Sequence, residues 1–142
     1  MPSPFTLSER VRWIDCDAAG IIYYGAYIRF FEIAETEMYR SIGLPYAVAF
    51  ETIDCFPIRA SYHCDYRYPP RLDDLMDISV WISHWGRTSF TASFRFTLNG
   101  TDTVLAEGYC RQVTVDRIEK RPVPIPELLK EKLARYTVVS SE

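Results

Sequence analysis

The chain has 142 residues, the length of one ordinary domain, and its fractions of apolar (48%) and charged (25%) residues are those of a globular protein. The formal net charge of −3 argues against a nucleic-acid-binding surface, which needs clustered positive charge. No apolar run is long enough for a membrane span, and Met1–Arg12 lacks the apolar stretch of a signal peptide. We therefore expect a cytoplasmic protein with reduced thiols at all four cysteines: Cys16, Cys55, Cys64 and Cys110.

The common catalytic and metal-binding motifs are missing from this sequence. It contains no CxxC pair, no GxSxG or HExxH motif and no phosphate-binding loop, and its two histidines are His63 and His84. We expect no metal and no cofactor. Any chemistry must then come from carboxylates, backbone amides or tyrosines.

The first third of the chain predicts a strand followed by a long helix. Alternating apolar residues predict a strand over Phe5–Trp13, and the polar segment Asp15–Gly20 ends it. Apolar residues at helical spacing predict a helix over Tyr27–Ile42, apolar on most sides and therefore buried. Gly43 is well placed to end this helix, and Pro45 stops it.

A period-two pattern over Phe56–Tyr68 predicts a long strand with two different faces. The apolar face consists of alternate residues: Phe56, Ile58, Ala60, Tyr62, Cys64, Tyr66 and Tyr68. The polar face consists of the residues between them: Arg59, Ser61, His63, Asp65 and Arg67.

Three further strands are predicted at Leu75–Trp85, at Thr88–Leu98 and from Val104 onwards, and an Asn-Gly pair at 99–100 marks a hairpin. The apolar phase of the last strand changes after Gly108, which predicts a β-bulge near Cys110–Gln112.

This order of elements predicts an α+β fold in one domain, residues 1–142. One long helix is wrapped by an antiparallel sheet of about five strands, and a short C-terminal helix begins at about Pro126. Such a sheet has edge strands that a second copy of the chain can cover, so we expect a homo-oligomer.

The stretch from Asp15 to Tyr27 is the best candidate for a site. Asp15 and Asp17 follow the first strand, and a Tyr-Tyr-Gly segment precedes the helix, whose first amides are free to bind an anion. A carboxylate held there could attack a carbonyl or activate water against it, while the amides hold the oxyanion. In the alternative interpretation, both acids only stabilise the turn and cap the helix.

Residues 15–27, DCDAAGIIYYGAY, together with Phe30-Phe31-Glu32, closely resemble the opening motif of the 4-hydroxybenzoyl-CoA thioesterase family of hotdog-fold proteins. A second stretch, Tyr66–Leu75, resembles the family's segment between two strands. The resemblance extends from about Val11 to Asp116. It implies a hotdog fold, hydrolysis of aromatic or short-chain acyl-CoA thioesters, and a dimer or homotetramer.

The resemblance also implies roles for individual residues. Asp17 matches the catalytic carboxylate, which acts as a nucleophile that forms a mixed anhydride or as a general base for water. The backbone N–H of Tyr24 or Gly25 polarises the carbonyl, and Asp15 stabilises the turn. Glu32 resembles a residue that recognises the polar end of the acyl group; alternatively, it is a paired acid on a partly exposed face.

Coenzyme A requires cations for its phosphates and apolar walls for its acyl group. Phe56 is a candidate wall. The segment with Arg87, Thr88 and Ser89 resembles the part of the family that meets the nucleotide from a neighbouring subunit. Arg59, on the polar face of the long strand, is an alternative phosphate ligand, unless that face is only solvated.

Two other functions remain open at this stage. One is hydrolysis of acyl groups carried by acyl carrier protein. The other is a non-catalytic module that binds acyl-CoA. The presence of Asp17 argues against the second, because a pure binding module gains nothing from a carboxylate beside a thioester.

Overall fold

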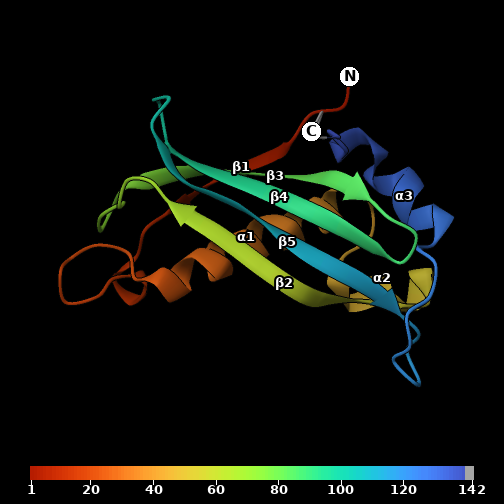
Figure 1. The fold of residues 1–142 in the computed structure, drawn as a ribbon. Helices are drawn as coiled ribbons and strands as arrows, with labels where there is room; N and C mark the ends of the chain where they lie inside the picture. Colours follow the sequence, from red (N-terminus) through yellow and green to blue (C-terminus); the bar gives the residue numbers. More distant parts are fainter. Residues whose placement is uncertain (140–142) are drawn as a thin grey trace.

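The computed structural model describes residues 1–139. It confirms the predicted α+β class, with five antiparallel strands in one sheet: β1 (Phe5–Arg10), β2 (Phe56–Tyr66), β3 (Leu75–Trp85), β4 (Ser89–Leu98) and β5 (Val104–Val115). The strand order is β1-β3-β4-β5-β2, so β1 and β2 are the two edges of the sheet (Figure 1).

The helices are α1 (Tyr24–Ser41), α2 (Tyr46–Ile53) and α3 (Glu127–Leu133), with 3-10 turns at Trp13–Asp15 and Ala134–Tyr136. The long helix α1 lies against one face of the sheet, and no helix within residues 1–139 covers the opposite face (Figure 1). Gly43 ends α1 with a φ of +80°, the left-handed conformation that a glycine adopts without strain. The α3 helix lies in the segment where the sequence predicts a terminal helix.

The core lies between α1 and the sheet. Inward-facing residues of β3 and β4 alternate as predicted and are at most 1% exposed: Ile78, Val80, Ile82, Phe90, Ala92, Phe94 and Phe96. They meet Phe30, Phe31, Ala34 and Met38 of α1, which are equally buried. The helical pattern of α1 and the period-two patterns of β3 and β4 therefore identify the two surfaces that form the core. The predicted apolar face of β2 is largely outside it, since Ile58 and Tyr66 are 46% and 52% exposed.

The first strand ends earlier than the sequence predicts, because Asp15 folds the chain back. The backbone N–H of Asp15 donates to the carbonyl of Arg12 (2.9 Å), and the backbone N–H of Arg12 donates to the Asp15 carboxylate (2.9 Å). A 3-10 turn replaces the end of the strand, and Trp13 projects from the surface with 83% of its area exposed.

The helix α2 was not predicted from the sequence. Pro45, which the sequence predicts as the stop of α1, lies beyond the end of that helix; it fixes the backbone before α2 and is its N-cap residue. Buried Ala49 and Ile53 lie one turn apart on α2, and Asp54 ends it in the left-handed conformation (φ 53°). Gly43 therefore ends one helix, and Pro45 begins the next.

The bulge predicted at Cys110–Gln112 is wrong. In the pairing of β2 with β5, the register shift lies in β2, between Arg59 and Ser61, where Ala60 is the extra residue. In β5 the inward phase continues unchanged through Cys110, Gln112 and Thr114, all at most 2% exposed. The sequence pattern suggested a change of phase because two of these inward positions, Gln112 and Thr114, carry polar residues.

The bulge also corrects the predicted face of Arg59. Instead of lying on the outer face, its guanidinium reaches inward and pairs with the carboxylate of Glu35, which is 1% exposed. Tyr46 and Gln112 also donate hydrogen bonds to this carboxylate, each with a donor–acceptor distance of 2.7 Å. Burial alone would lower the pKa of Arg59, but the hydrogen bond and charge of Glu35 raise it. Four elements, α1, α2, β2 and β5, therefore meet at one buried charge.

We predict that Glu35→Ala destabilises the protein by roughly 3–5 kcal/mol, since it leaves Arg59 and Gln112 without their buried acceptor. The matched control is Glu37→Ala in the same helix, whose ion pair with Arg40 (3.2 Å) lies at the surface and is worth about 0–1 kcal/mol. Urea unfolding of both variants measures the difference. Equal losses of stability would contradict this account of Glu35.

Candidate active site

The segment that carries Asp17 is a tight hairpin. Cys16 and Ile22 form an antiparallel bridge, and the backbone N–H of Asp17 donates to the carbonyl of Ile21 (3.0 Å). The N–H of Gly20 donates to the carbonyl of Asp17 (3.0 Å), and the φ of Gly20 is +77°, which favours glycine. The turn-forming residues seen in the sequence thus hold Asp17 at the tip of a hairpin that leads directly into α1.

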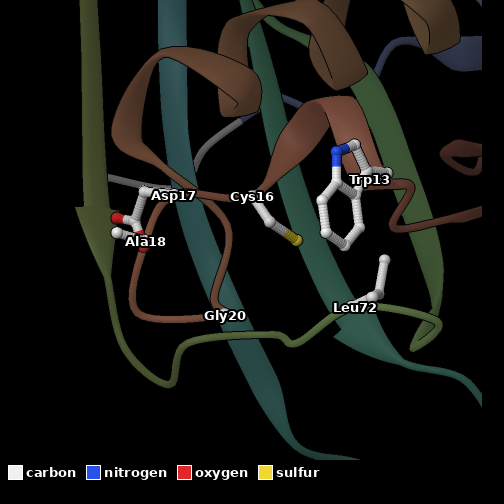
Figure 2. A pocket seen from close by; sticks show the side chains of 6 residues that line it. All are labelled: Trp13, Cys16, Asp17, Ala18, Gly20 and Leu72. Carbon is white, nitrogen blue, oxygen red and sulfur yellow. The ribbon is translucent and has the colours of Figure 1, made fainter.

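The carboxylate of Asp17 is exposed. One of its oxygens accepts the backbone N–H of Ala19 (2.8 Å), and within residues 1–139 the other oxygen has no partner. Figure 2 shows this carboxylate pointing away from Trp13 and Leu72, whereas the thiol of Cys16 points toward them. One carboxylate oxygen is therefore available for chemistry.

A hollow of about 440 Å³ lies beside this hairpin (Figure 2). Its lining residues are Trp13, Cys16, Asp17, Ala18, Gly20 and Leu72. Because the Asp17 carboxylate points to the other side, the hollow alone does not bring a ligand to the free oxygen of this carboxylate. In a single chain, the side of the hairpin that carries this oxygen is open to solvent.

The start of α1 provides the amides that the sequence predicts. The N–H of Tyr23 donates to the carbonyl of Asp15, and the N–H of Ala26 donates to the carbonyl of Tyr23. Both N···O distances are 3.0 Å. The amides of Tyr24 and Gly25 find no acceptor among the described residues. They lie at the positive end of the helix dipole and can bind an oxyanion.

Asp15 is the buried acid of the pair, with 1% of its area exposed. Its carboxylate accepts hydrogen bonds from Arg29 of α1, including one from Nε over 3.1 Å. The sequence offered no indication of this partner, which is fourteen residues away on a helix.

Glu32 lies on the exposed side of α1, two turns beyond Gly25. Ile28 and Tyr24 lie one and two turns before Glu32 on the same side of the helix, and they are also exposed (42% and 80%). Glu32 has no ion pair among the described residues, so it is not the paired acid of the alternative interpretation.

The other predicted substrate-binding residues lie at the opposite end of the sheet (Figure 1). Arg87 and Thr88 lie in the loop between β3 and β4, and Ser89 begins β4. Phe56 begins β2 and packs against Phe50, with ring centroids 5.7 Å apart. The length of β3, eleven residues, separates the two ends by about 30 Å. Within one chain, the structure does not bring these residues to Asp17.

Within residues 1–139, no helix is long and apolar enough to cross a membrane. In the same part of the chain, no three side chains of the metal-binding types (His, Cys, Asp, Glu) lie together as the ligands of one ion would.

Cys16 provides a test of the charge around the hairpin. Burial and the carboxylates of Asp15, Asp17 and Asp73 raise the pKa of its thiol, which lowers the reactive thiolate fraction near neutral pH. We predict that Asp17→Asn lowers this pKa and speeds alkylation of Cys16 by iodoacetamide at pH 8, measured by peptide mass spectrometry. Buried Cys110 serves as the internal control. An unchanged Cys16 rate would show that the Asp17 charge does not reach the thiol.

Comparison with known proteins gives consistent matches. A family model described as the thioesterase-like superfamily matches residues 11–133. The acyl-CoA thioester hydrolase YbgC of Escherichia coli O157:H7 is 31% identical over 123 residues, which cover 87% of this chain and 90% of that protein. The 4-hydroxybenzoyl-CoA thioesterase of Pseudomonas sp. is 32% identical over 96 residues, 63% of this chain and 65% of that one.

Solved structures agree with these matches. A hypothetical protein from Aquifex aeolicus superimposes with a TM-score of 0.83 at 28% identity, covering 92% of this chain and 99% of that one. The 1,4-dihydroxy-2-naphthoyl-CoA thioesterase from Synechocystis has a TM-score of 0.84 at 17% identity, with 93% and 96% covered, and shares the fold. The family membership that the motif at residues 15–27 indicates is confirmed: the chain belongs to the thioesterase-like superfamily of hotdog-fold proteins.

Proposed function

We propose that this protein hydrolyses acyl-CoA thioesters to the free acid and coenzyme A. The observation that carries this proposal is the exposed Asp17 carboxylate on a hairpin that is bridged to the segment leading into α1. Beyond it lie the two free amides of Tyr24 and Gly25. The relatives with acyl-CoA thioester hydrolase and 4-hydroxybenzoyl-CoA thioesterase in their names support the reaction class.

Two routes fit this arrangement. As a general base, Asp17 takes a proton from water as the water oxygen attacks the thioester carbon; the C–S bond then breaks, and the departing thiolate of coenzyme A takes up a proton. As a nucleophile, a carboxylate oxygen of Asp17 displaces the thiolate, and water hydrolyses the mixed anhydride. In both routes the Tyr24 and Gly25 amides bind the oxyanion. Incorporation of ¹⁸O into Asp17 after a single turnover in ¹⁸O-water establishes the second route, because only attack of water on the Asp17 carbonyl carbon of the anhydride places the label there.

The acyl group is proposed to run along the exposed side of α1, past Tyr24 and Ile28 toward Glu32. Seven residues of helix place Glu32 about 10 Å from the amide of Gly25 along the axis. An aromatic or short acyl group with a polar end fits this span. The unpaired carboxylate of Glu32 would accept a hydrogen bond from that end.

The active site is proposed to be completed by another copy of the chain in a dimer or tetramer. Edge strand β2 has eleven residues and pairs on one side only, so a long row of backbone groups is left for a partner strand. The start of α1 lies beside the end of this strand, since the rings of Tyr27 and Tyr66 are 4.7 Å apart. A second copy on β2 would enclose the exposed side of Asp17.

Arg87, Thr88, Ser89 and Phe56 are then proposed to reach the substrate from another subunit. Arg87 is exposed and has no ion pair among the described residues, so its charge is available for a phosphate. Arg59 is less suited to that role because Glu35 already engages its guanidinium. We also propose a cytoplasmic location, in which all four cysteines would be reduced thiols.

We predict that Asp17→Asn lowers kcat for acyl-CoA hydrolysis by about 10²–10⁴-fold, since an amide neither accepts a proton from water nor attacks the thioester. Substrate affinity should change much less. The measurement is steady-state kinetics on a panel of acyl-CoA and acyl-carrier-protein esters, with thermal melts as the folding check.

Asp102→Asn, at an exposed turn, is the matched control and should keep wild-type kcat. A folded Asp17→Asn variant that keeps more than a tenth of wild-type kcat would rule out Asp17 as the catalytic carboxylate. Wild-type hydrolysis of the carrier-protein esters alone would assign the alternative function.

We predict that Arg87→Ala raises KM for an acyl-CoA about ten- to a hundredfold, the range of one charge-assisted phosphate contact. The pantetheine ester of the same acyl group lacks the nucleotide and should show a much smaller effect. Equal effects on both esters would exclude a nucleotide contact.

Mixing the Asp17→Asn and Arg87→Ala chains tests whether Arg87 acts across the interface. In a hybrid dimer, the intact Asp17 of one chain meets the intact Arg87 of the other. Activity at low substrate should therefore rise above that of either variant alone. No rise after verified subunit exchange, or a fully active monomer at high dilution, would contradict the shared site.

A further inference from the structure

The ion pair between Asp15 and Arg29 links the two halves of the proposed active site. Arg29 lies in the second turn of α1, and Asp15 lies two residues before Asp17. Its fully buried carboxylate accepts only the Arg29 guanidinium and the backbone N–H of Arg12 among the described residues. Arg29 is therefore the cation that compensates this buried charge.

Asp15 also holds the start of the helix through its backbone. Its carbonyl accepts the N–H of Tyr23, the N-cap residue of α1, over 3.0 Å. The next residue, Cys16, forms the bridge to Ile22 that closes the hairpin. Asp15 thus contacts both the segment that carries Asp17 and the helix end that presents the free amides.

The surroundings of Arg29 indicate that its main contribution is this contact. Its side chain is 43% exposed and lies over the ring of Phe30, with 4.6 Å between the guanidinium carbon and the ring centroid. The other buried acid, Glu35, differs because Tyr46 and Gln112 also donate to it.

We propose that Arg29 is a positioning residue for the thioesterase reaction. By pinning Asp15, it fixes the Asp17 carboxylate relative to the amides of Tyr24 and Gly25, and it does not itself touch the substrate. This inference rests on the proposed function. Attack on a carbonyl requires the base or nucleophile and the oxyanion donors to be held to within a fraction of an ångström.

The test is Arg29→Gln, which keeps the aliphatic stem and removes the charge. We expect kcat to fall about 10- to 100-fold, as a displacement of about 1 Å does, while KM stays within about twofold because the nucleotide contacts lie elsewhere. Arg29→Lys restores the charge and should recover part of kcat. If the single variant unfolds, the double variant Asp15→Asn with Arg29→Gln replaces it. The double variant also lacks the ion pair but leaves no unpaired buried charge, so it should fold and show the same fall in kcat.

Hydrogen–deuterium exchange provides a readout that is independent of activity. Peptides covering residues 15–25 should exchange faster in Arg29→Gln, while those of β3 and β4 should not change. Arg40→Gln is the matched control, because its ion pair with Glu37 lies on the surface of the same helix. It should alter neither kcat nor exchange at residues 15–25.

Wild-type kcat in folded Arg29→Gln would overturn the proposal, and so would unchanged hydrogen–deuterium exchange at residues 15–25. An increase in KM alone would also overturn it, because it would mean that Arg29 binds the substrate. A wild-type protein inactive on every thioester would remove the proposed function and the catalytic role with it. Faster exchange in Arg29→Gln would then still show that Arg29 holds the hairpin.

Discussion

Enclosure of α1 by the sheet is the constraint on which the rest of this structure depends. A helix that is apolar on most sides is stable only if most sides are covered, and Phe30, Phe31 and Met38 are at most 1% exposed. Each such side chain contributes about 1.5–3 kcal/mol when fully buried. With the helix fixed lengthwise along the strands, its first amides lie at one end of the sheet, where the Asp17 hairpin begins. The position of the site thus follows from the packing of the core.

Apolar packing is not directional, so it does not by itself set how far α1 slides or turns against the sheet. Two buried carboxylates supply that information. Asp15 accepts from Arg29 near the start of the helix, and Glu35 of α1 accepts from Arg59 two-thirds of the way along. A displacement of one turn would leave both carboxylates buried without a cation, which is costly. These pairs select one arrangement of helix and sheet.

The predicted functional residues divide into two groups at opposite ends of the molecule. Asp17, Tyr24 and Gly25 gather at the start of α1, whereas Phe56, Arg87, Thr88 and Ser89 gather at the far end of the strands. A substrate with an acyl group at one end and a nucleotide at the other needs both groups. The free edge of β2 gives a physical route by which two copies could bring them together.

The sequence by itself determined the features that depend on near neighbours in the chain: the strands β3, β4 and β5, the buried helix, the Gly43 terminus and the turn that carries Asp17. That β2 pairs with β5, and not with β3 that follows it in the chain, is a long-range choice that only the fold shows. Only the tertiary structure decided the bulge at Ala60, the inward direction of Arg59 and the burial of Glu35. The partners of Glu35 lie 11, 24 and 77 residues away, and Gln112 at an inward position looks like a solvent-facing residue in the sequence. A polar residue shows its partner only when the chain is folded, because the same pattern serves a solvated face and a buried ion pair equally well.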